Sequence, residues 1–217
     1  MRKIYYIILF LLFILSSQAQ KYEFDLLTKY NSISVNFERE SLVYSNSRNQ
    51  NYFLYVERDS LTKHAKLYDI ENKTLHNFLI LESKQKNELF FEFKYLDSKA
   101  INQESSFHNY EFDVKSINSD SIYKVIKIEL FKNKKRKKPE MISVLKVKNS
   151  NNNLFPLFRF SCLHPFEFNR NLNFTENVIV ESATETLFSG IKIEHKLLYF
   201  KEIKLEIQIP KTKNQMK

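Results

Sequence analysis

The stretch ELFFEFKYL, residues 88–96, decides the fold class because its apolar and polar side chains alternate. In an extended chain every second side chain points to the same face. One face of this stretch is therefore apolar, and it consists of Leu89, Phe91, Phe93 and Tyr95. The other face carries Glu88, Glu92 and Lys94, joined by Phe90. This period of two predicts a half-buried β-strand.

The same period recurs in HNYEFDVK, residues 108–115, in KEIKLEIQI, residues 201–209, and in several noisier runs. The breaks between the runs are short and polar, and many contain asparagine, which tolerates positive φ and caps its own backbone. Such spacing predicts an antiparallel meander. We therefore expect a mainly β fold with one large curved antiparallel sheet of about nine to eleven strands. A sheet of this size curls into a half-barrel or splits into a two-layer sandwich.

The segment from Leu154 to Asn169 does not alternate, and its two prolines exclude an ordinary central strand. We expect it to be irregular and to pack on the concave side of the sheet, with one short helix after Pro165. Its phenylalanines are the predicted core contacts and the candidate ligand-facing residues: Phe155, Phe158, Phe160, Phe166 and Phe168.

The composition excludes several kinds of site. The chain has 1 glycine, which rules out a Rossmann fingerprint and a P-loop. Its 1 cysteine rules out an internal disulfide and any multi-cysteine metal site. None of the 5 histidines pairs with another at a spacing of two or four residues. We expect no cofactor and no metal site.

Cys162 and His164 are the one pair that could act as a nucleophile and its base. No third orienting group or oxyanion-hole loop is identifiable, and a free cysteine among phenylalanines is usually a small buried hydrophobe. The sequence therefore predicts a buried, inert thiol and a protein that is not an enzyme.

Residues 1–19 have the layout of a cleaved secretory signal peptide. Arg2 and Lys3 precede an apolar run from Ile4 to Leu15, and Ser17 and Ala19 are small residues before Gln20. Twelve residues are too few to span a bilayer as a helix. We expect export to the periplasm or beyond, a single β-rich domain over residues 20–210, and a disordered tail over 211–217.

The formal net charge of +9 owes much to one short run, KNKKRKK. Its positive residues are Lys132, Lys134, Lys135, Arg136, Lys137 and Lys138. The run lies between two predicted strands, so it is a candidate hairpin tip on the surface. It could also contact an anionic membrane surface, at about 1 kcal/mol per charge. The predicted export argues against a nucleic acid partner.

The signal peptide, a first strand reading YEFDLLTKY, the successive hairpins and the aromatic interior together resemble exported bacterial envelope β-sheet proteins of the lipoprotein-carrier type. The resemblance is one of pattern and has no residue-level motif. It implies a curved sheet that could hold an acyl chain. Two functions follow as expectations: binding of a lipid or other apolar ligand in the concavity, or interaction with another envelope protein. An enzyme is the third alternative.

Overall fold

The structure is a computed structural model that describes residues 20–58, 63–85, 88–101, 110–119, 122–133, 135, 138–163, 172 and 174–210. These residues form eleven strands and one helix. The strands are β1 (Gln20–Ser34), β2 (Phe37–Ser45), β3 (Tyr52–Arg58), β4 (Lys63–Asp69), β5 (Thr74–Gln85), β6 (Glu88–Ala100), β7 (Glu111–Ser119), β8 (Tyr123–Phe131), β9 (Met141–Asn149), β10 (Val178–Leu187) and β11 (Lys192–Ile209). The helix is α2 (Phe155–Cys162).

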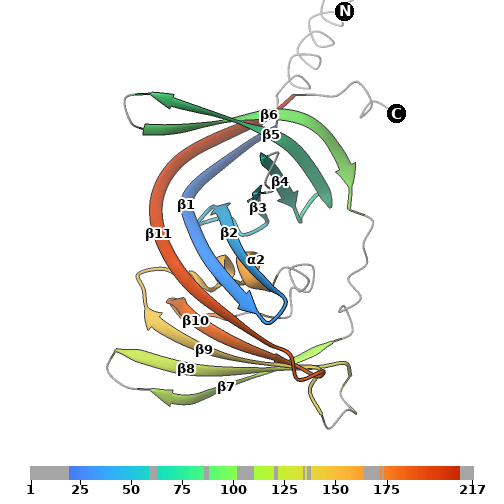
Figure 1. Ribbon diagram of the computed structural model, residues 1–217, viewed down its shortest axis with the longest axis vertical. Coiled ribbons are helices and arrows are strands. Elements are labelled where there is room, and N and C mark those ends of the chain that lie inside the picture. The colour runs from blue at the N-terminus through green and yellow to red at the C-terminus, as the bar shows by residue number, and fades with distance from the viewer. Residues whose placement is uncertain are drawn as a thin grey trace, which may run out of the picture.

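All eleven strands belong to one antiparallel sheet that is not closed into a barrel. The strand order is β6-β5-β4-β3-β2-β1-β11-β10-β9-β8-β7. The two longest strands, β1 and β11, lie in the middle, and the sheet curls away from them on both sides (Figure 1). The predicted mainly β, antiparallel fold is confirmed, and the form that it takes is a single curled sheet.

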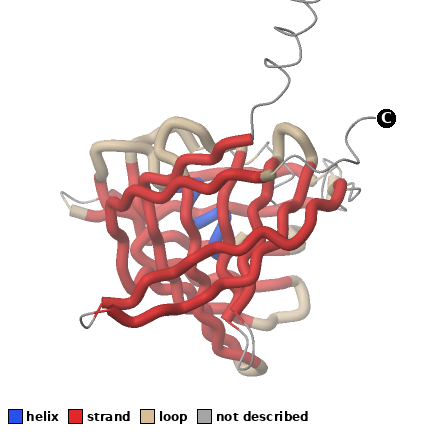
Figure 2. Tube along the Cα trace, turned by 90° about the horizontal axis from the view of Figure 1, so that it is seen from above, coloured by secondary structure: helices blue, strands red, loops and turns tan. Residues whose placement is uncertain are grey.

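Helix α2 lies inside the curl of the sheet (Figures 1 and 2). The prediction of an irregular segment was wrong for this part of Leu154–Asn169. All eight helical residues are buried, so α2 has no polar face and leaves no amphipathic period in the sequence. Pro156 lies in the first turn, where its missing N–H costs nothing. The helix predicted after Pro165 falls outside the described residues.

Residues 41–45 of β2 and 53–56 of β3 are buried on both faces, which explains why the alternation of these segments is weak in the sequence. Leu42 and Tyr44 of β2 pack in the same cluster as Phe24. The residue between them, Val43, belongs instead to the cluster that contains Phe160 of α2. The curled sheet therefore encloses two packed interiors, and these two strands separate them.

The turns use asparagine as a capping residue, as the sequence predicts. Asn46 Oδ1 accepts hydrogen bonds from the backbone N–H groups of Arg48 and Asn49, both at 2.9 Å. Positive φ occurs at other residue types. Among the described residues it is found at Lys73, with φ of 50°, and at Gly190, with φ of 84° in the β10–β11 turn. In the described turns asparagine therefore acts by capping and not by taking positive φ.

Candidate functional site

The concave side of the sheet is filled around α2. Phe155, Phe158 and Phe160 are all buried there. The Phe160 ring stacks on Phe53 with centroids 4.4 Å apart, and the Phe158 ring meets Tyr30 edge-on at 5.6 Å. These three candidate ligand-facing residues therefore contact protein. Phe166 and Phe168 lie outside the described residues.

Two largely apolar hollows lined by described residues are small. One lies between β2 and β6, beside Leu42 and Phe93, and the other lies between Leu26 and Leu157, under α2. Each has a volume of about 10 Å³. A site for a drug-sized ligand needs about 300 Å³ or more. Neither hollow has room for an acyl chain.

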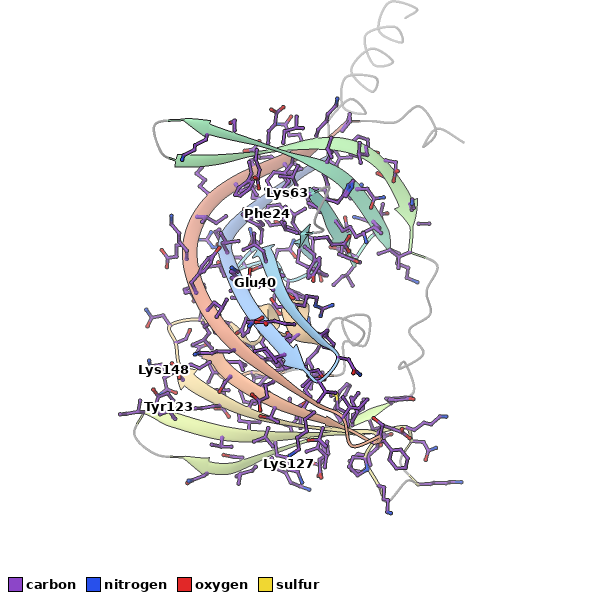
Figure 3. All side chains as sticks on the ribbon, in the orientation of Figure 1. Phe24, Glu40, Lys63, Tyr123, Lys127 and Lys148 are labelled. Carbon is purple, nitrogen blue, oxygen red and sulfur yellow. The ribbon has the colours of Figure 1, made fainter. Side chains whose placement is uncertain are left out.

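A larger cleft of about 370 Å³ opens beside the irregular pairing of β1 and β11. Charged side chains dominate its lining: Glu23, Asp25, Arg48, Lys204 and Glu206. Some of these side chains already bind neighbouring residues. Asp25 Oδ1 accepts a hydrogen bond from Ser47 N at 2.7 Å, and Glu206 Oε2 forms an ion pair with Lys21 Nζ at 2.8 Å. Figure 3 shows Phe24, the main aromatic residue of the lining, within the upper curl of the sheet. The charged walls make this cleft unsuitable for an apolar ligand.

A buried polar cluster surrounds Cys162 at the end of α2. His195 Nδ1 lies 2.7 Å from Ser32 Oγ, and His195 Nε2 lies 3.4 Å from Glu185 Oε1. Burial raises the pKa of the Cys162 thiol well above its usual range, and the nearby Glu185 carboxylate adds to the rise, against the opposing effect of Ser32. A raised thiol pKa suppresses the reactive thiolate. The predicted burial of Cys162 is confirmed, and His164 lies outside the described residues.

A second buried polar cluster lies beside the apolar cluster that contains Phe24, and it is formed around Tyr22, Asp69 and His76. The Tyr22 hydroxyl donates a hydrogen bond to Asp69 Oδ2 at 2.6 Å and lies 3.1 Å from His76 Nε2. His76 Nδ1 in turn lies 2.6 Å from Ser98 Oγ. Burial raises the pKa of Tyr22, with Asp69 adding to the rise, and burial lowers the pKa of His76 against the opposing pull of Asp69. The cluster therefore joins β1, β4, β5 and β6 as neutral phenol, neutral imidazole and hydrogen-bonded carboxylate.

Three turns lie together at one edge of the curled sheet, at the lower right of Figure 1. The β1–β2 turn meets the β10–β11 turn because Ser34 Oγ donates a hydrogen bond to the Lys192 carbonyl at 2.9 Å. The β10–β11 turn meets the β8–β9 connection because Phe188 N donates to the Glu140 carbonyl at 2.8 Å. We call the described residues of 33–37, 132–140 and 188–192 the turn edge.

The turn edge exposes large apolar side chains. Val35 is 85% exposed and Phe188 is 67% exposed, the highest values for large apolar side chains among the described residues. Three further exposed apolar residues share these two turns: Ile33, Phe37 and Ile191. The sequence did not identify this group, because Val35 and Phe188 are far apart in the chain and are brought together by the pairing of β1 with β11.

The basic run lies in the β8–β9 connection, beside those apolar turns. Lys132, Lys135 and Lys138 are exposed there. Lys134, Arg136 and Lys137 lie outside the described residues. Asn133 Oδ1 accepts a hydrogen bond from Lys135 N at 3.0 Å, another asparagine-capped turn.

Two kinds of feature are absent from the described part of the chain. It contains no group of three or more histidine, cysteine, aspartate and glutamate residues that could hold a metal ion. Its helices include none that is long and apolar enough to cross a membrane.

The comparisons with known proteins give little guidance. No family model matches the chain, and no curated protein sequence matches it. One solved structure to which it is similar is a DUF1329 family protein from Desulfovibrio piger, at 7% sequence identity and a TM-score of 0.25. The match covers 85% of this chain and 86% of that chain. A TM-score this low does not establish a common fold.

Proposed function

We propose that this chain is an exported, non-enzymatic interaction module of the bacterial envelope, and that the turn edge is its contact surface. The single observation that carries the proposal is the contrast between a filled concavity and an exposed apolar edge. Phe158 and Phe160 occupy the space that a ligand would need, whereas Val35 and Phe188 project into solvent. Exposed apolar clusters rimmed by polar residues typically mark interaction sites.

Export is supported by residues 1–19, whose charge, apolar run and small residues follow the pattern of a signal peptide. We expect the mature chain to begin at Gln20 or within about two residues of it. N-terminal sequencing of the protein recovered outside the cytoplasm tests this. Recovery of the intact chain from Met1 in the membrane fraction would contradict it.

A carrier of a lipid or other apolar ligand in the curved sheet is the alternative from the sequence pattern. It has less support, because the two largely apolar hollows beside Phe93 and under α2 measure about 10 Å³ each. An enzyme also has less support. The polar clusters around Cys162 and around Asp69 are buried, which keeps both away from a substrate in solvent.

Native mass spectrometry of the mature protein purified from its own host separates the module from the carrier. The module should give the mass of the bare polypeptide. A co-purified acyl lipid could be bound in the concavity, as in a carrier, or at the turn edge. The double variant Val35→Ser/Phe188→Ser distinguishes the two, because it removes the apolar side chains of the turn edge. A lipid retained by this variant would contradict the module.

A further inference from the structure

The kind of partner that fits the turn edge follows from its shape. Its apolar side chains stand on separate turns rather than on one broad face: Ile33, Val35 and Phe37 on one turn, and Phe188 and Ile191 on the next. A stable protein interface buries about 1,200–2,000 Å² around a continuous apolar centre. A few projecting tips supply much less apolar area. They are suited to entering the soft interface between headgroups and acyl chains.

The charged residues beside these apolar side chains indicate the sign of the partner's charge. The run of residues 132–138 carries six positive residues in the sequence, and the three that the structure describes are exposed. Three carboxylates lie at or next to this edge, those of Glu38, Glu140 and Glu194, and the exposed Lys192 adds a fourth described positive charge. Glu38 Oε1 already accepts a hydrogen bond from Asn31 Nδ2 at 2.8 Å. The edge is therefore net positive. Two copies of this chain would repel each other there, whereas an anionic surface would be attracted.

We infer that the turn edge docks on an anionic lipid bilayer. Val35 and Phe188 enter the interface, and the exposed Lys132, Lys135 and Lys138 meet the phosphate headgroups. This inference rests on the proposed function, since it names the partner of the proposed contact surface. Apolar tips and basic residues together give the two signals that reversible membrane binding requires.

Co-sedimentation of the mature protein with vesicles tests the inference. We expect binding to vesicles of equal phosphatidylglycerol and phosphatidylcholine, and little binding to phosphatidylcholine alone. Binding should weaken as NaCl rises from about 0.05 M to about 0.5 M. The variants Val35→Ser/Phe188→Ser and Lys132→Ser/Lys135→Ser/Lys138→Ser should each lower the affinity about tenfold or more.

Matched controls lie away from the turn edge, including residues at the β7–β8 turn. Ile117 and Ile122 flank the β7–β8 turn and are 56% and 57% exposed. The variant Ile117→Ser/Ile122→Ser should bind like the unaltered protein. Lys94, Lys99 and Lys201 are exposed lysines on β6 and β11, away from the turn edge, so their triple serine variant controls for loss of charge.

Three results would overturn the inference. They are the absence of binding to anionic vesicles, equal losses for the control and turn-edge variants, or a dimer that the Val35→Ser/Phe188→Ser change dissociates. The last result would assign the edge to a second copy of the chain. The proposed function fails on different results: an acyl lipid that the Val35→Ser/Phe188→Ser variant retains in native mass spectrometry, or recovery of the intact chain from Met1 in the membrane fraction.

Discussion

Ser34 Oγ donates a hydrogen bond to the carbonyl oxygen of Lys192 at 2.9 Å, and this contact ties the β1–β2 turn to the β10–β11 turn. The two residues are 158 positions apart in the chain. They meet because the first and last strands of the described chain, β1 and β11, pair in the middle of the sheet. This pairing assembles the exposed apolar side chains of the turn edge from two ends of the sequence.

The turn edge should contribute little to stability. The variant Val35→Ser/Phe188→Ser removes side chains that are mostly exposed, so each change should alter the free energy of unfolding by about 0.5 kcal/mol or less. Urea denaturation followed by circular dichroism measures this. A loss of several kcal/mol would show that the tips belong to the core, and losses of vesicle binding would then reflect unfolding.

Phe160 should be essential to the fold. It is buried and stacks between α2 and β3, at 4.4 Å from Phe53. Phe160→Ala should lower the free energy of unfolding by about 3–5 kcal/mol, because the cavity left behind cannot fully close. Phe188→Ala is the matched control, with an expected change of about 0.5 kcal/mol or less. Equal effects of the two changes would contradict the packing of α2 in the concavity.

Cys162 should be unreactive while the protein is folded. It is buried, and burial raises the pKa of its thiol well above its usual range. We expect slow labelling by a maleimide in buffer at neutral pH and fast labelling in urea. The variant Cys162→Ala should cost about 1 kcal/mol for the lost sulfur and the small cavity. Fast labelling of the folded protein would contradict this burial and reopen the pairing of Cys162 with His164 as nucleophile and base.

Acidification should destabilise the protein through His76. Burial lowers the pKa of this imidazole, so His76 stays neutral in the folded protein. In the unfolded chain the same imidazole becomes protonated below about pH 6.5. Its contribution is therefore complete above that pH and is lost as pH falls towards the folded pKa. Unfolding measured between about pH 7.5 and pH 5.5 should show a smaller pH dependence in His76→Gln than in the unaltered protein. An identical slope in both would contradict this.

The strands were predictable because alternation records burial on one face. In β6, the side chains of Phe91, Phe93 and Tyr95 pack against the cluster that contains Phe24. The side chains of Glu92 and Lys94 on the other face are exposed. Helix α2 was not predictable from periodicity, because it is buried on every side and has no polar face. Sequence patterns report the environment of one element at a time.

The polar clusters and the turn edge depend on which elements become neighbours. Ser32, Glu185 and His195 come from three different strands, and no local pattern connects them. The basic run was visible in the sequence because its six charges are contiguous. The apolar tips beside it were not, since only the strand order brings Phe188 next to Glu140 and Ser34 next to Lys192.

The most direct test of the central claim uses a single tryptophan, because the chain has none. Val35→Trp places it on the turn edge, and Ile117→Trp places it at the opposite edge as a control. With vesicles rich in phosphatidylglycerol, we predict a blue shift and quenching by bromine-labelled acyl chains for Val35→Trp, and neither change for Ile117→Trp. Unchanged emission from Val35→Trp, or equal quenching at both positions, would contradict docking through the turn edge.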